Sequence, residues 1–342
     1  MRVLLDITYV RRAPASGTGV YLDRLQAALL QLEGIEVTAV ADPRRQPPAG
    51  GGIGSLRNAL ADQWWTQIEL PRLARSARAE LIHHPLPAYC STTRLPQVIT
   101  VHDLAFERLP AKFDRRYRTY ARLAHRAAAR HAAAVVCVSE ATAADVRDRW
   151  GIAPERIAVA HHGPGQPLPD YARRTPTHFL YVGDDEPRKN LTLLLAGYGA
   201  YRAAAPEPLE LVLAGSAVRS GPGVQTVSAP SAAQLAALYT GAAALVHPAA
   251  LEGFGLTVLE AMSLATPVIA VDTPAAREVC GAGAEYLAAG SPDALAQALT
   301  RLAGDASAQR DLGRRGRERA TQFSWAASAH RHLEAYSCAL TR

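Results

Sequence analysis

Short apolar runs alternate with longer amphipathic runs along this chain. The short runs are rich in Val, Ile, Leu and Ala, and each has the length of one buried strand. Strands that alternate with helical runs are typical of βαβ units, so the pattern predicts an α/β protein with parallel sheets. In chain order, the predicted strands are Val3–Ile7, Glu36–Val40, Leu81–His84, Val98–Val101, Ala134–Val138, Ile157–His161, Phe179–Val182, Leu209–Ala214, Gln225–Val227, Ala244–His247, Pro267–Val271 and Glu285–Leu287.

The chain is long for one hydrophobic core at 342 residues, which favours two domains. The Pro- and Gly-rich run 163–169 separates the first six predicted strands from the last six and is the best linker candidate. We therefore expect domains at residues 1–165 and 174–324. Helices are predicted at Gly19–Leu32 and Ala141–Trp150, and the Pro- and Gly-rich run Ala41–Ser55 predicts a loop.

Bulk composition is that of a water-soluble globular protein, with 49% hydrophobic and 20% charged residues. No apolar run approaches the ~18 residues of a membrane span. The first apolar run is too short for a signal peptide, and four scattered cysteines form no C-x-x-C pair. We therefore expect reduced thiols and a cytoplasmic location.

Arginine dominates the net charge of +6. Within Arg108–Arg130, arginines interleave with aromatic and apolar residues, as in a basic amphipathic helix. Such a helix can contact an anionic membrane, which would place the protein peripherally at the inner membrane face. The alternative is a solvated helix face. A nucleic-acid-binding role is not expected, because no recognisable binding module accompanies the basic charge.

The segment from Glu252 to Glu260 carries the most chemistry. A Gly253–Phe254–Gly255 bend follows the first carboxylate, and a helical run begins at Leu256 and Thr257. A helix N-terminus presents unpaired N–H groups that suit phosphate, and glycines allow close approach of the backbone. Glu252 can accept hydrogen bonds from sugar hydroxyls, and Glu260, further along the helix, from a ribose. The alternative is a surface loop that caps a core helix.

Other polar residues also follow predicted strands, where ligands bind in open parallel sheets. His102 and Asp103 follow the fourth strand, and Gly17–Thr18–Gly19 lies between the first strand and the first helix. Arg188 and Lys189 follow the strand that opens the second half. Two adjacent cations are suited to a diphosphate. The histidines show no metal-ligand spacing, and no Asp-x-Asp pair occurs.

The Glu-x7-Glu segment and the Pro187–Arg188–Lys189–Asn190 loop resemble motifs of the family-4 retaining glycosyltransferases. The resemblance implies the GT-B fold, in which two Rossmann-like domains face each other across an interdomain cleft. It assigns the acceptor side to the first domain and the nucleotide sugar to the second. It also implies that a final helix within residues 325–342 packs back on the first domain. One departure is Asp184, which stands where many members carry arginine.

The resemblance implies a role for each matching residue. Glu252, His102, Arg188 and Lys189 would act at the reacting centre and the leaving diphosphate. The remaining positions would bind substrate: Gly17, Thr18, Gly19, Asp103, Val227, Ser228, Gly253, Phe254, Gly255, Leu256, Thr257 and Glu260. No metal ion and no cofactor are expected besides the nucleotide-sugar donor.

The implied reaction is retaining transfer of a hexosyl group from a UDP- or GDP-linked sugar to a hydroxyl. The expected partners are therefore the nucleotide-sugar donor and a glycan, lipid-linked or small natural-product acceptor. The alternatives within the same fold are a nucleotide-sugar 2-epimerase and a sugar phosphorylase. The sequence leaves the nucleotide, the sugar, the acceptor, the linkage and the oligomeric state open.

Overall fold

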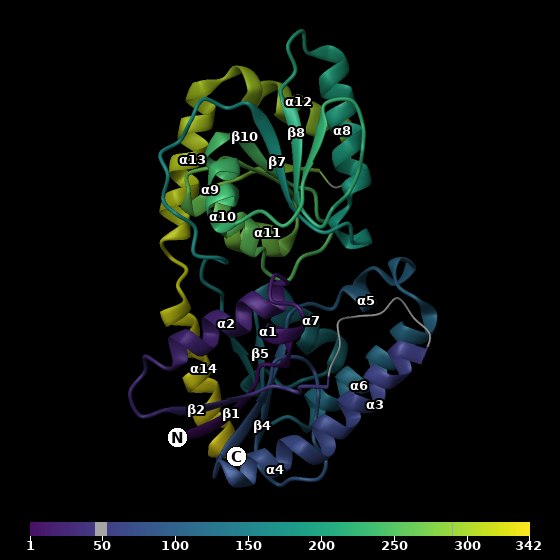
Figure 1. Ribbon diagram of the computed structural model, residues 1–342, viewed down its shortest axis with the longest axis vertical. Helices are drawn as coiled ribbons and strands as arrows, with labels where there is room; N and C mark the ends of the chain where they lie inside the picture. The colour runs from purple at the N-terminus through teal and green to yellow at the C-terminus, as the bar shows by residue number, and fades with distance from the viewer. Residues whose placement is uncertain (45–52, 289) are drawn as a thin grey trace. The chain divides into compact units, whose positions relative to one another are not determined.

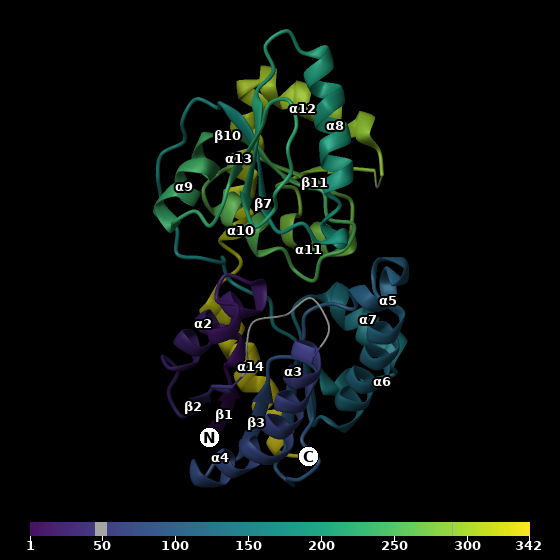
Figure 2. The ribbon, with the colours of Figure 1, turned by 45° about the vertical axis from the view of Figure 1, so that its right-hand side comes forward.

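The computed structural model describes residues 1–44, 53–288 and 290–342. The chain divides into two compact units, residues 1–163 with 324–342, and residues 164–323. Each unit contains a six-stranded parallel sheet flanked by helices (Figure 1 and Figure 2). The α/β class predicted from the sequence is confirmed.

The sheet of the first unit has the strand order β2-β1-β3-β4-β5-β6. Its central strands are buried along their whole length, which explains why they read as continuous apolar runs. The strands are β1 (Arg2–Asp6), β2 (Glu36–Val40), β3 (Leu81–His84), β4 (Gln97–Val101), β5 (Ala134–Cys137) and β6 (Ile157–Val159).

Helices of the first unit connect and cover these strands. They are α1 (Thr8–Arg12), α2 (Gly17–Leu29), α3 (Ile53–Trp64), the π-helix η1 (Trp65–Glu69), α4 (Leu70–Ser76), α5 (Ala105–Arg108), α6 (Arg115–His131), α7 (Glu140–Trp150) and α14 (Trp325–Leu340), with short 3₁₀ turns η2 (Pro110–Lys112) and η3 (Pro154–Arg156).

Two expectations are corrected in this unit. Gly17–Thr18–Gly19 forms the first turn of α2 and not a separate loop, because the Ser16 hydroxyl accepts from the Gly19 N–H at 3.1 Å and starts the helix there. Gly19 is required, since a Cβ would lie 2.2 Å from the Ala13 carbonyl oxygen. The predicted loop Ala41–Ser55 ends earlier, because α3 begins at Ile53; residues 45–52 of that prediction lie outside the described residues.

The last helix, α14, belongs to the first unit and lies among its purple and blue elements in Figure 1. Its attachment is polar as well as apolar. The Tyr336 hydroxyl lies 2.8 Å from His83 Nδ1, and the Tyr21 hydroxyl lies 2.9 Å from His332 Nε2. His332 Nδ1 lies 2.7 Å from the Ser328 carbonyl, so Nδ1 carries the proton and Nε2 accepts from Tyr21. Burial lowers the pKa of His332 to about 4, so the ring is neutral at pH 7.

The sheet of the second unit has the order β12-β11-β10-β7-β8-β9, so β7 and β10 are neighbours. The strands are β7 (His178–Gly183), β8 (Glu210–Gly215), β9 (Val224–Val227), β10 (Ala242–His247), β11 (Val268–Val271) and β12 (Glu285–Leu287). The helices are α8 (Leu191–Ala204), α9 (Ala232–Gly241), α10 (Leu256–Ser263), α11 (Pro274–Cys280), α12 (Pro292–Gly304) and α13 (Ala306–Ala320), with the 3₁₀ turn η4 (Pro187–Lys189).

Helices α8 and α12 pack together on one face of this sheet (Figure 2). Leu194 and Tyr198 of α8 and Leu299 of α12 join Phe179 and Leu213 of the strands in one buried apolar cluster. This core holds β7 firmly, and the loop after β7 carries two of the candidate functional residues.

Candidate functional site

Two loops meet where neighbouring strands β7 and β10 end. The loop after β7 leads into η4, and the loop after β10 leads into α10. The Ala250 N–H donates to the Arg188 carbonyl at 3.0 Å and ties the loops together. Because both strands run in the same direction, their carboxyl ends share one edge of the sheet. This arrangement brings Arg188 and Lys189 next to Glu252, 63 residues along the chain from Lys189.

Glu252 is the centre of an ion cluster. Lys189 Nζ donates to its Oε2 at 2.5 Å, and Arg188 Nη1 lies 3.2 Å from each carboxylate oxygen. All three side chains are between 14% and 18% exposed. Burial alone would raise the pKa of the Glu252 carboxyl, but the charges of Lys189 and Arg188 outweigh it and hold that pKa well below its usual range. The carboxylate is therefore ionised and is paired with two cations.

His247, the last residue of β10, adjoins this cluster. Its Nε2 lies 3.8 Å from Glu252 Oε2 and its side chain is buried. Burial lowers the pKa of His247 to about 4, so the ring is neutral at pH 7. Sequence reasoning did not single out this histidine. Its position at the carboxyl end of a strand that leads to the site is the signal that could have found it.

The bend after Glu252 sets the start of α10. Gly255 has a φ of +101°, a conformation that favours glycine, and it is the N-cap of the helix. Leu256 and Thr257 form the first turn, where backbone N–H groups have no partner within the helix. Phe254 is buried, and its ring packs edge-on against Phe323 at 5.7 Å between centroids. Backbone amides of this bend, not the Phe254 ring, can therefore contact a ligand.

Glu260 lies on α10 and is 4% exposed. Its Oε1 accepts from the Gln166 N–H at 2.8 Å, and its Oε2 accepts from the Tyr239 hydroxyl at 2.7 Å. Burial raises the pKa of the Glu260 carboxyl, whereas these two hydrogen bonds lower it and offset only part of that rise. Neither Gln166 nor Tyr239 was a sequence candidate. Their contacts join residues 94 and 21 positions apart, which no local motif encodes.

The other candidates of the second unit are Val227 and Ser228, at the end of β9 and just beyond it. Beside them, Gly183 and Gly215 end the paired strands β7 and β8. A Cβ on Gly215 would lie 2.5 Å from the Gly183 carbonyl oxygen, so the two backbones approach too closely for a side chain there.

The candidates of the first unit are Gly17, Thr18, Gly19, His102 and Asp103. His102 Nε2 donates to the Pro85 carbonyl at 3.1 Å, since a carbonyl only accepts, and this leaves Nδ1 as an acceptor. Burial lowers the pKa of His102, so the ring is neutral at pH 7. Asp103 Oδ1 accepts from the N–H of Ala105, the first residue of α5, at 2.8 Å.

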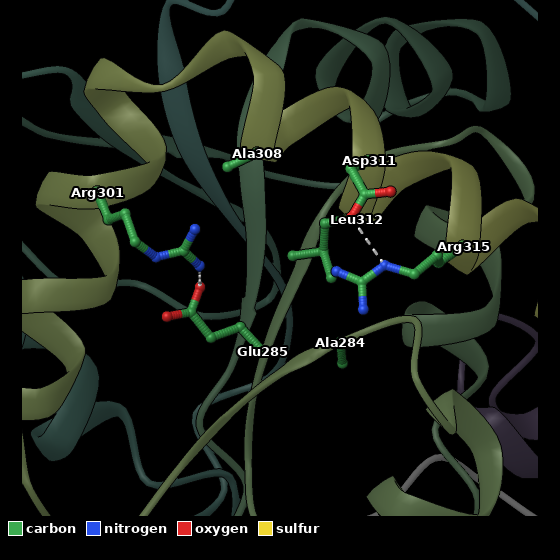
Figure 3. A pocket seen from close by; sticks show the side chains of 7 residues that line it. All are labelled: Ala284, Glu285, Arg301, Ala308, Asp311, Leu312 and Arg315. Carbon is green, nitrogen blue, oxygen red and sulfur yellow. Dashed lines mark hydrogen bonds and ion pairs between the residues drawn. The ribbon is translucent and has the colours of Figure 1, made fainter.

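A pocket of about 290 Å³ in the second unit contains none of these candidates. Figure 3 shows that Arg301 points toward Glu285 and Arg315 toward Asp311. Each arginine is paired with a carboxylate, so the pocket has no excess positive charge for an anionic ligand.

Across the described ranges, no three His, Cys, Asp or Glu side chains are grouped so that they could hold a metal ion. Within the same residues, no helix has the length and apolar character needed to cross a membrane.

The two units coincide with two family models. The model for Glycosyltransferase Family 4 matches residues 15–163, and that for Glycosyl transferases group 1 matches residues 171–319. The chain belongs to the family-4 retaining glycosyltransferases. Members of this family use nucleotide-sugar donors and in general need no metal ion.

Relatives of established activity agree with this membership. An MMP alpha-(1->4)-mannosyltransferase of Mycolicibacterium hassiacum is 30% identical over 63% of this chain and 56% of its own length. The chain spans about half the length of this relative and of several other curated relatives that it matches. An alpha-maltose-1-phosphate synthase of Mycolicibacterium smegmatis is 28% identical over 94% of this chain and 95% of its own length.

The fold also matches solved structures. HepE of Anabaena, in complex with UDP and glucose, superposes with a TM-score of 0.69 at 18% identity, over 98% of this chain and 99% of that chain. The GT-B fold expected from the sequence is confirmed.

Proposed function

We propose that the protein transfers a hexosyl group from a nucleotide sugar, with retention at the anomeric carbon, to an acceptor hydroxyl. The observation that carries this proposal is the ion cluster of Lys189, Arg188 and Glu252, which lies beside the N-terminal turn of α10. Two cations and a row of backbone amides form a preorganised site for charge that develops on a departing diphosphate. The donor is UDP- or GDP-linked, and the acceptor is a glycan, a lipid-linked sugar or a small natural product.

The candidates around the ion cluster have defined roles in this proposal. Lys189 and Arg188 bind the diphosphate, assisted by the amides of Leu256 and Thr257. Glu252 and the amides of Gly253–Gly255 fix the hydroxyls of the donor sugar, and Glu260 accepts from the ribose. The leaving phosphate oxygen assists deprotonation of the acceptor hydroxyl, so the protein supplies no strong general base.

The first unit supplies the remaining candidates. His102 borders the anomeric centre and offers the unprotonated Nδ1 as an acceptor for a sugar hydroxyl. Gly17, Thr18 and Gly19 present the N-terminal amides of α2 to the donor phosphates. Asp103 holds the loop that carries His102 through its hydrogen bond from the Ala105 N–H.

A panel of nucleotide sugars in a thermal-shift assay tests the donor. A donor at about 100 times its Kd should add ~2.7 kcal/mol of stability. Incubation with sugar-labelled donor then separates the reactions within this fold. In transfer or donor hydrolysis the label leaves the nucleotide, whereas in 2-epimerisation it stays. The proposal fails if no nucleotide sugar and no nucleoside diphosphate stabilises the protein.

We further propose that α6 contacts an anionic membrane surface. Its 17 residues include six arginines and no acidic residue. Tyr117, Tyr120 and Leu123 are 49%, 59% and 71% exposed on the same helix. Cations together with exposed apolar side chains fit the boundary between headgroups and acyl chains. This contact would place the protein in the cytoplasm, peripherally bound at the inner membrane face and near a lipid-linked acceptor.

Cosedimentation with lipid vesicles tests this contact. Binding should require anionic lipid and weaken in high salt, and Leu123→Ser with Tyr120→Ser should reduce it about tenfold. Equal binding to neutral vesicles, or no binding to anionic ones, would contradict it.

A further inference from the structure

The carboxylate of Glu260 is buried with two neutral hydrogen-bond donors. Among the described residues, these are the backbone N–H of Gln166 and the hydroxyl of Tyr239. An ionised carboxylate offers about four acceptor positions, and buried positions without donors are costly. Two positions therefore remain for a ligand. A ligand with two adjacent hydroxyls, such as a ribose, supplies the two missing donors.

The Tyr239 hydroxyl fixes how this carboxylate is turned. Tyr239 is 0% exposed in the last turn of α9. Its hydroxyl lies 2.7 Å from Glu260 Oε2 and 3.2 Å from the Thr257 carbonyl oxygen, so its one proton is directed mainly to the carboxylate. Burial, and then the Glu260 charge, raise the pKa of Tyr239 well above its usual value. The hydroxyl therefore stays protonated and acts as a donor.

The backbone of Tyr239 is also held in place. Its carbonyl accepts from Arg173 Nη1 at 2.8 Å and from Thr266 Oγ1 at 2.8 Å. On the opposite side of Glu260, a Cβ on Gly165 would lie 2.1 Å from Oε1. The carboxylate is thus confined between a fixed tyrosine and the backbone of the segment that opens the second unit.

We propose that Tyr239 is a positioning residue for donor recognition: it orients the Glu260 carboxylate so that its free acceptor positions meet both ribose hydroxyls. Tyr239 itself does not touch the donor. This inference rests on the assignment of Glu260 to the ribose under the proposed function.

The experiment compares a nucleoside diphosphate with its 2′,3′-dideoxy analogue by titration calorimetry. UDP and GDP are both tried, and the one that binds is used. The ratio of the two Kd values measures how much the protein gains from the ribose hydroxyls. In the wild type the dideoxy analogue should bind at least about tenfold more weakly, as expected for hydrogen bonds to a charged acceptor. Tyr239→Phe should lower the ratio about fivefold, with binding of the dideoxy analogue changed less than about twofold.

Tyr201→Phe is the matched control, because it also removes one buried hydroxyl, bonded to the Leu209 N–H of the same unit. Its ratio should stay at the wild-type value. A purely structural role for Tyr239 would weaken both ligands equally and leave the ratio unchanged.

Two outcomes separate this inference from the proposed function. If Glu260→Gln lowers the ratio but Tyr239→Phe does not, the positioning role is wrong and the assignment of Glu260 stands. If Glu260→Gln leaves the ratio unchanged, the ribose assignment itself is wrong. If Tyr239→Phe does not fold, Glu260→Asp replaces it in the experiment. This variant keeps the carboxylate charge but moves it away from the Tyr239 hydroxyl. An unchanged ratio of the two Kd values in Glu260→Asp would overturn the positioning role.

Discussion

Replacement of Glu252 by glutamine should tighten the binding of a free nucleoside diphosphate while it slows transfer. In the wild type, Glu252 already pairs with Lys189 and Arg188, the two cations assigned to the diphosphate. A diphosphate must compete with this carboxylate for both of them. Glu252→Gln keeps the shape of the side chain and removes the competing charge.

The distances set the size of this effect. At 3.2 Å, the separation of Arg188 Nη1 from Glu252, one charge pair is worth ~5 kcal/mol at an effective dielectric constant of about 20, and ~1 kcal/mol in bulk water. The side chains of the cluster are 14–18% exposed, so solvent weakens this interaction. In the wild type, a bound diphosphate also replaces part of the pairing that the two cations lose with Glu252. We therefore expect a net gain of about 1–2 kcal/mol, or roughly five- to thirtyfold in Kd.

Transfer should respond in the opposite direction. Loss of the carboxylate that fixes the donor sugar should lower kcat on the order of 10²-fold, comparable to loss of one oxyanion-hole donor. The unliganded variant should also lose about 1–3 kcal/mol of stability, because the largely buried cations Lys189 and Arg188 lose the charge of Glu252 beside them. Calorimetric titration with UDP or GDP and initial rates of label release measure the two effects on the same preparations.

Glu186→Gln is the control for this prediction. Glu186 Oε2 lies 2.6 Å from Arg188 Nε, but its side chain is 48% exposed. Exposed ion pairs contribute about 0–1 kcal/mol, so the diphosphate affinity of Glu186→Gln should change less than about fivefold. If folded Glu252→Gln binds the diphosphate no better than the wild type does, the cluster is not the diphosphate site.

Three further predictions concern catalysis, donor recognition and pH. Lys189→Ala should lower kcat/KM on the order of 10²–10³-fold, and near-normal kinetics would remove Lys189 from the site. The wild-type rate should persist in excess EDTA, and a loss of rate that magnesium restores would contradict metal-independent transfer. Gly165→Ala should raise the donor KM about tenfold, because the new Cβ would lie 2.1 Å from Glu260 Oε1 and force the carboxylate to move. Gly199→Ala is the control: its Cβ meets open space, so the donor KM should not change. The pKa of His332 is lowered from 6.5 to about 4 in the folded protein, so its contribution to stability is present above pH 6.5 and is lost as pH falls toward 4. Other buried histidines, such as His247, titrate in the same range. In urea unfolding, His332→Gln should therefore lose ~2 kcal/mol less stability between pH 7 and pH 5 than the wild type does.

The strands were predictable because buried parallel strands are continuous apolar runs bounded by turns. All twelve predicted strands are present, and each predicted end lies within two residues of the observed one; β10, for example, begins at Ala242 and not at Ala244. Helix starts were less predictable. The glycines after Ser16 read as a loop, but a serine hydroxyl that caps Gly19 draws them into α2. A capping bond of this kind is decided by one side-chain rotamer.

The placement of the candidate loops followed from the rule that ligands bind at the carboxyl ends of parallel strands. What the sequence did not reveal is which candidates pair with each other. Glu252 and Lys189 each matched a motif, but their contact depends on the adjacency of β7 and β10 in the sheet. Tyr239 lies in an alanine-rich helix, and nothing in the local sequence indicates its contact with Glu260, which forms only when the chain folds.

The return of α14 to the first unit has a consequence for biosynthesis. The second unit is one uninterrupted stretch of chain, whereas the first needs residues from both ends of the polypeptide. On the ribosome, Tyr21 and His83 are made early, yet their hydrogen-bond partners His332 and Tyr336 emerge some 250 or more residues later. Until then, Tyr21 of α2 and His83 of β3 lack these partners and the helix that covers them. Premature termination near residue 324 should therefore harm the oldest part of the nascent protein and spare the newest.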